Sequence, residues 1–127
     1  MNNDTQKLIA RIFLSVIFIL AGAFKFPAIA GTAGYISSVG LPAATLLAWL
    51  AAIFELVAGL MILVGYQTKL TSWALAAFCL FTAVVFHNNF GDQIQMIMFM
   101  KNIAIAGGFL LLAITGAGAY SVDARRS

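Results

Sequence analysis

Charged residues are scarce in this chain, at 9% of its 127 residues against roughly 25% in soluble globular domains. Hydrophobic residues make up 63%. A protein of this size leaves much of its surface exposed, so a soluble fold of this composition would have an apolar exterior. The composition therefore excludes a soluble globular enzyme, a disordered chain and a nucleic-acid-binding module.

Cysteine and histidine are almost absent, with Cys79 and His87 the single examples of each. One cysteine excludes a disulfide framework, a dithiol redox pair and a zinc or iron–sulfur site built within one chain. One histidine excludes bis-histidine haem ligation in a monomer. Glycine-rich nucleotide loops and the GxSxG nucleophile motif are also missing. The sequence predicts no metal site and no built-in cofactor, so a redox role would need a diffusible or partner-bound cofactor.

Four apolar runs, each long enough to cross ~30 Å of hydrocarbon, dominate what is present. They cover about residues 8–26, 43–65, 70–86 and 94–115. Segments without water around them must satisfy their backbone internally, so all four are expected to be helices. The first run is too long for a typical signal-peptide core and is taken as a retained span. We predict an all-α fold, an integral membrane four-helix bundle forming one domain over residues 1–127.

The connection between the first two runs is bracketed by Pro27 and Pro42 and rich in glycine. That punctuation argues against another span, but residues 31–40 could form a short interfacial helix with Tyr35 at the lipid headgroups. Nothing in the C-terminal tail predicts an element that folds alone.

Apart from Lys25 and Lys101, which lie within the spans, the basic residues collect on one side of the predicted membrane. They are Lys7, Arg11, Lys69, Arg125 and Arg126. The opposite loops carry no basic residue. Because basic loops stay in the cytoplasm, both termini are predicted to be cytoplasmic.

Five polar side chains lie within or at the ends of the spans: Lys25, Glu55, His87, Lys101 and Asn102. A charged side chain at the centre of a span costs ~2.5–3.5 kcal/mol on insertion scales, so such groups usually face the bundle interior and pair. Glu55 is the deepest, near the midplane. These five residues are the predicted polar pocket and ligand-binding site.

Helical spacing indicates which way each charge points. Glu55 shares a face with small residues: Ala48, Ala51, Ala52, Ala58 and Gly59. Lys101 groups with Ala104, Ile105 and Gly108, and Lys25 groups with Ala21 and Gly22. We therefore expect a Glu55–Lys101 pair, with Lys25 and His87 nearer the mouth. One carboxylate between two ammonium groups would leave excess positive charge for an anionic or carbonyl-bearing ligand.

Plainer interpretations accompany this pocket. A Glu–Lys pair can serve only to fix helix register. His87 can cap a helix end, and Asn88, Asn89 and Asp92 have the composition of a turn. The three methionines at 96, 98 and 100 alternate around a helix and are expected to be apolar filler rather than a copper site.

The same residues resemble the DoxX family of small four-span bacterial membrane proteins. The resemblance runs over about residues 8–123, through RIFLSVIFILAGAFKF, AGTAGYISSVGLP, FELVAGLMILVG, FHNNF and FMKNIAIAGGFLLL. Where the family typically reads FHNFW, this chain has FHNNFG and lacks the tryptophan.

The resemblance implies a protein of the bacterial inner membrane. It also implies an association with redox proteins, since the family is named for a subunit of a thiosulfate:quinone oxidoreductase. The leading hypothesis is a membrane subunit of a redox assembly whose pocket binds a quinone, with Phe24, Phe26, Phe86 and Phe90 stacking on the ring. The alternatives are a small-molecule or lipid carrier and a structural anchor without a ligand. The expected partners are the lipid bilayer, a redox protein and further copies of the chain.

Overall fold

The architecture comes from a computed structural model that describes residues 2–126. Its elements are α1 (Asn3–Lys25), η1 (Phe26–Ala28), α2 (Ile29–Ser38), α3 (Ala44–Val64), α4 (Thr68–Phe86), α5 (Gln93–Thr115) and α6 (Val122–Arg126). The described residues contain no strand. Four helical segments are long and apolar enough to cross a membrane: Asn3–Ser38, which joins α1 to α2, then α3, α4 and α5. The all-α membrane fold is confirmed.

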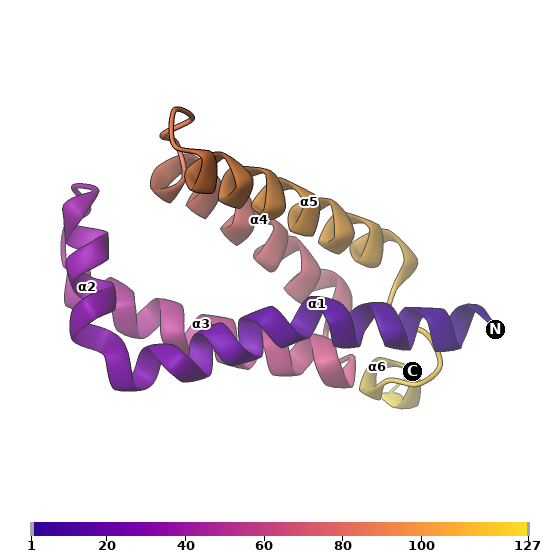
Figure 1. The fold of residues 1–127 in the computed structure, drawn as a ribbon. Coiled ribbons are helices and arrows are strands. Elements are labelled where there is room, and N and C mark those ends of the chain that lie inside the picture. Colours follow the sequence, from indigo (N-terminus) through magenta and orange to yellow (C-terminus); the bar gives the residue numbers. More distant parts are fainter. Residues whose placement is uncertain (1, 127) are drawn as a thin grey trace.

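The long helices form two antiparallel pairs, α1 with α3 and α4 with α5 (Figure 1). The pairs meet near the two chain ends and diverge away from them. We call the end with α6 and both termini the closed end, and the end with α2 and the α4–α5 turn the open end. The divergence means that α1 and α3 are separated from α4 and α5 at the open end.

Glycine allows α1 and α3 to lie in close contact. A Cβ atom on Gly22 would lie 2.5 Å from the Leu56 backbone nitrogen and 2.9 Å from the Ala52 carbonyl oxygen. A Cβ atom on Gly59 would lie 3.0 Å from the Ile19 nitrogen. Backbone atoms cannot move aside as a flexible side chain can, so any larger residue would push the helices apart.

The hydrophobic core fills the region where the two pairs meet. Phe18, Ile62, Leu75 and Phe109 are all buried there. The Phe18 and Phe109 rings contact edge to face at a centroid distance of 5.6 Å. These four residues come from α1, α3, α4 and α5, so the core joins the two helix pairs and holds the closed end together.

The connection after α1 continues as helix rather than loop. Pro27 lies at the start of η1, where its missing N–H costs nothing. The helix expected near residues 31–40 is α2, Ile29–Ser38, and it packs on α3 through Ile36 and Ala48. The Tyr35 ring of α2 stacks on the Phe86 ring at a centroid distance of 5.4 Å, and the Tyr35 hydroxyl donates to the Phe86 carbonyl. These contacts join α2 to the end of α4. The location of α2 at a membrane interface stays a prediction.

Arg11, which the charge pattern counts among the cytoplasmic basic residues, is completely buried at the closed end. Its guanidinium donates to the carbonyl oxygens of Ile62 at 3.3 Å and Leu63 at 3.0 Å, and also to that of Tyr120. The last carbonyls of a helix have no partner within it and carry partial negative charge. Arg11 therefore joins α1 to the end of α3 and to the tail.

The C-terminal tail is ordered by contacts with the rest of the chain, not by its own composition. The Asp123 carboxylate accepts from the backbone N–H groups of Gln67 and Thr68, each at 2.8 Å, at the start of α4. Gln67 has no side-chain cap of its own. Asp4 accepts from the Ala119 N–H at 3.0 Å. The tail thus caps one helix and contacts another.

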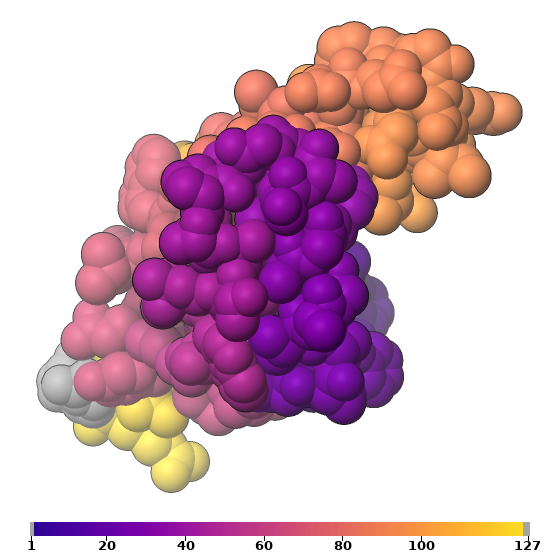
Figure 2. All heavy atoms as spheres, turned by 90° about the vertical axis from the view of Figure 1, so that its left-hand side faces the viewer, coloured from indigo at the N-terminus to yellow at the C-terminus, as the bar shows by residue number. Residues whose placement is uncertain are grey.

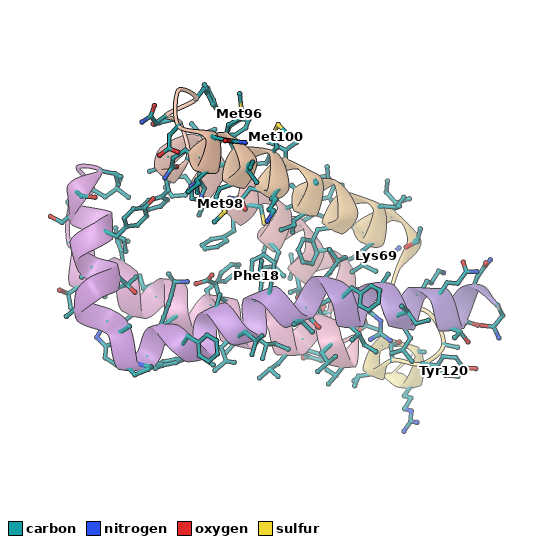
Figure 3. All side chains as sticks on the ribbon, viewed as in Figure 1. Phe18, Lys69, Met96, Met98, Met100 and Tyr120 are labelled. Carbon is teal, nitrogen blue, oxygen red and sulfur yellow. The ribbon has the colours of Figure 1, made fainter. Side chains whose placement is uncertain are left out.

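The orientation of this fold in the membrane stays a prediction. Both termini lie at the closed end (Figure 1), and so do Lys7, which donates to the Thr115 carbonyl, and Lys69, which lies beside Gly116 (Figure 3). Basic residues favour the cytoplasm. Reporters fused after Ser127 and after Gln67 should both report a cytoplasmic location, and a reporter fused after Asn89 should report the opposite side. A cytoplasmic signal at Asn89 together with external signals at the other two sites would reverse the assignment.

Candidate functional site

A cavity of about 1,090 Å³ lies between the two helix pairs. It is lined by parts of α1, α2, α3, α4 and α5. Figure 2 looks onto the open end, where α2 lies in front and the α4–α5 turn projects beyond it. Six aromatic rings line the cavity: Phe18, Tyr35, Phe54, Phe78, Phe81 and Phe86. Its volume is slightly above the ~300–1,000 Å³ usual for small-molecule sites, and its walls are mainly apolar, as is typical of such sites.

An ion pair lies in the wall that α1 and α3 form. The Lys25 Nζ atom is 2.8 Å from Glu55 Oε2. The Glu55 side chain is 7% exposed and that of Lys25 is 28% exposed, and both residues line the cavity. The pair is electrically neutral as a unit, so this wall offers ammonium donors without excess positive charge.

The expected Glu55–Lys101 pair is wrong. Lys101 is exposed on α5 and is not among the residues that line the cavity. Helical spacing grouped it with Gly108, and Gly108 does pack on Leu14 of α1. Lys101 lies two turns nearer the open end, where α5 has already diverged from α1, so the same helix face no longer meets a neighbour. The expected excess of positive charge beside Glu55 is therefore also wrong.

The prediction for the face of α3 is confirmed. Ala48, Ala52, Glu55, Ala58 and Gly59 are buried, whereas the bulky residues of the opposite face are exposed. Small residues let a neighbouring helix approach, and larger apolar residues are suited to contact lipid. Glu55 points into the protein because its helix neighbours do.

The opposite wall of the cavity carries uncharged polar groups. The Asn102 amide donates to the Thr82 hydroxyl at 3.0 Å, and that hydroxyl donates to the Cys79 carbonyl at 3.1 Å. His87 Nδ1 lies 3.0 Å from the Gln95 Oε1 atom. His87 and Asn102 line the cavity. Of the five predicted pocket residues, the structure places four in the cavity wall, and it joins Lys25 directly to Glu55.

Sequence reasoning missed Tyr35 and Thr82 as cavity residues. The sequence pattern predicts only a position at the lipid interface for Tyr35 and no role for Thr82. A usable signal was the spacing of Cys79, Thr82 and Phe86, which places all three on one face of α4. They line the cavity together.

Three of the four phenylalanines expected at the mouth lie elsewhere. Phe26 packs on Trp49 and Phe90 on Phe99, and Phe24 is 68% exposed. Only the expectation for Phe86 agrees with the cavity lining. Phe24 and Phe26 lie where α1 ends and η1 begins, and Phe90 lies in the α4–α5 turn. The helix direction changes at these points, so periodicity within one helix does not predict which way their rings point.

The methionines of α5 do not converge. Met98 points into the space between the helix pairs, and Met96 and Met100 lie on the other side of the helix (Figure 3). Met98 lines the cavity as an apolar side chain. Within residues 2–126, no group of three or more His, Cys, Asp or Glu side chains is placed to hold a metal ion.

Known proteins resemble this chain over most of its length. The DoxX family model matches residues 6–88. Inner membrane protein YqjF of Escherichia coli is 47% identical over 120 residues, which are 94% of this chain and 91% of that protein. Inner membrane protein YphA of the same organism is 42% identical, over 93% of this chain and 88% of that protein. ER-derived vesicles protein ERV29 of Saccharomyces cerevisiae is 30% identical over 83 residues, 61% of this chain and 27% of that protein. No solved structure matches.

Proposed function

Since this chain belongs to the DoxX family, we propose that it is an inner-membrane protein that binds a quinone in the cavity between its helix pairs, as the membrane subunit of a redox assembly. The observation that carries the proposal is the neutral Lys25–Glu55 pair in the wall of a large cavity with mainly apolar and aromatic walls. Such a site suits a ligand with an apolar body and a polar, uncharged head.

The cavity is large enough to hold a ring together with part of an apolar tail. At about 1,090 Å³ it exceeds the space that a single ring needs. The aromatic side chains around it can stack on a flat ring, which favours a planar headgroup over a sugar or phosphate head.

Lys25 is suited to hold a carbonyl oxygen. An ammonium group has three N–H donors, and one lies toward Glu55 Oε2. The remaining donors are available to a ligand, and Lys25 is the more exposed partner of the pair. An anionic head would need a positive charge that Glu55 already neutralises. The pair therefore favours a neutral carbonyl over a carboxylate.

The uncharged wall supplies a polar partner for a second carbonyl. The Asn102 amide has two N–H donors and directs one of them to the Thr82 hydroxyl, so the other can meet a ligand carbonyl. The hydroxyl hydrogens of Thr82 and Tyr35 are already directed to the carbonyls of Cys79 and Phe86. A group with polar atoms on both sides of one ring would contact both walls. The Glu55 carboxyl group and the His87 imidazole line the same cavity and can donate or accept a proton there.

We propose the association with a redox protein because a bound quinone needs a donor of electrons. When bound, a quinone supplies two-electron, two-proton chemistry. The chain has one cysteine and so cannot form a dithiol pair to deliver electrons. In the proposed assembly, this subunit binds and orients the ring in a site with little water, and a partner protein delivers the electrons.

Titration of the purified protein with decylubiquinone and a short-tailed menaquinone tests the binding step. We expect saturable binding that Lys25→Met weakens at least tenfold, because the ammonium donor is lost, which corresponds to about 1.4 kcal/mol or more. Lys101→Met is the matched control: it removes the same charge outside the cavity and should bind like the parent.

A second variant keeps the ion pair intact. Ala51 lines the cavity, and Ala51→Phe should fill part of it and weaken binding without touching Lys25 or Glu55. The proposal fails if neither quinone binds saturably. It also fails if Lys25→Met, Ala51→Phe and Lys101→Met all bind as the parent does.

A further inference from the structure

Lys101 lies on a face of α5 that has the spacing of a helix-packing seam. Ile94, Ile97, Lys101, Ala104 and Gly108 follow one another at intervals of three and four residues, the repeat with which one helix packs along another. At Gly108 this face is already occupied, because a Cβ atom there would lie 3.1 Å from Leu14 of α1.

Between Gly108 and the open end, no other helix of the described chain covers this face of α5. Ile94 is 70% exposed and Ile97 41% exposed, and Ala104 and Lys101 are also exposed. The reason is the divergence of α1 from α5 toward the open end (Figure 1). We call Ile94, Ile97, Lys101 and Ala104 the upper α5 seam.

Lys101 has no counter-charge within the part of the chain that the structure describes, where it makes no ion pair and no side-chain hydrogen bond. An ammonium group inside a membrane span is expensive unless an anionic group meets it. The ion pair that sequence reasoning expected to neutralise Lys101 is made by Lys25 instead. We propose that the upper α5 seam binds a transmembrane helix of a different protein, one that carries an aspartate or glutamate at the level of Lys101.

A second copy of this chain does not supply that carboxylate. The chain has four acidic residues: Asp4, Glu55, Asp92 and Asp123. Glu55 is paired with Lys25, and Asp4 and Asp123 lie at the closed end. Copies related by an axis along the membrane normal lie at equal depth. Asp92 would then remain nine residues from Lys101, about 13 Å along the helix and beyond the roughly 6 Å reach of a lysine side chain.

A phospholipid headgroup is also a poor match. Lys101 lies seven residues inside the first apolar residue of the span, Ile94, which is about 10 Å. A side chain that reaches roughly 6 Å toward the surface ends short of the phosphates of an undistorted bilayer. A carboxylate on a neighbouring helix can lie at the required depth, and the small side chain of Ala104 lets that helix approach closely.

Photo-crosslinking in the native membrane tests the proposal. A photoreactive residue replaces Ile97 on the seam, and in the control it replaces Phe13, which is 74% exposed on α1. We expect the Ile97 probe, and not the Phe13 probe, to form an adduct with a different membrane protein that has an acidic residue in the matching half of a span. Lys101→Met should reduce the adduct at least tenfold.

Charge reversal separates a specific pair from chance proximity. Lys101→Glu should abolish the adduct, and changing the acidic residue of the captured helix to lysine should restore it. The inference is overturned if the Ile97 probe captures only another copy of this chain, only lipid or no protein. It is also overturned if the adduct forms equally in Lys101→Met. These outcomes do not depend on quinone binding, which the titration above tests separately.

Discussion

Replacing Lys25 with methionine should lower the free energy of unfolding by about 3 kcal/mol, because it leaves the Glu55 carboxylate unpaired. Glu55 is 7% exposed and its Oε2 atom lies 2.8 Å from Lys25 Nζ, so the charge has no ready route to water. Titration with SDS in mixed micelles measures this free energy. Lys101→Met is the control, and we expect it to change the value by less than ~0.5 kcal/mol, because Lys101 is exposed and unpaired in the isolated chain.

The double variant Lys25→Met, Glu55→Leu separates the energy of the pair from the energy of packing. Apolar residues of similar size often replace a buried ion pair at little cost, so the double variant should recover most of the lost stability. If Lys25→Met unfolds like the parent, or if the double variant is as unstable as the sum of the single changes, Lys25 and Glu55 are not coupled.

Arg11→Met should also be strongly destabilising, by about 2–4 kcal/mol. The substitution removes three hydrogen bonds from a charged donor to the carbonyls of Ile62, Leu63 and Tyr120, and each such bond is worth roughly 1.5–3 kcal/mol before the cost of burying the guanidinium is subtracted. The same loss should free the tail. Limited proteolysis should then cleave near Tyr120 faster than in the parent.

Two matched variants show whether the hydrogen bonds or the charge matter. Arg11→Lys keeps the charge but not the planar fork that reaches carbonyls on two segments, so it should fall between the parent and Arg11→Met. Lys7→Met removes a cation at the same end that is not buried, and it should have little effect on unfolding. Equal stability of Arg11→Met and the parent would show that the buried guanidinium adds nothing to the fold.

Local patterns were enough to predict much of this molecule. The buried face of α3 can be predicted from that helix alone, because residues three or four positions apart lie on the same side of a helix. Glu55 shares that side with alanines and a glycine. The four apolar helices follow from length and composition, because hydrocarbon leaves a backbone no other way to satisfy its polar groups. His87 and Asn102 also reach the cavity wall, as expected.

The partner of each charge could not be predicted in this way. Periodicity gives the direction of a side chain relative to its own helix, and it does not state how far apart two helices are at that height. Lys101 and Gly108 share a face of α5, yet Gly108 packs on Leu14 of α1 and Lys101 is exposed, because the helix pairs diverge between them. Lys25 meets Glu55 because Gly22, one turn earlier, brings α1 into contact with α3.

The sequence by itself determined that this is a helical membrane protein with Glu55 facing inward, since those properties depend on composition and on spacing within one helix. Only the tertiary structure decided that Lys25 neutralises Glu55, that Arg11 is buried against the tail, and that Lys101 is left on an open seam. These three outcomes depend on where helices converge and diverge. That geometry comes from packing between segments distant in the chain, where one glycine or one divergence decides which charges meet.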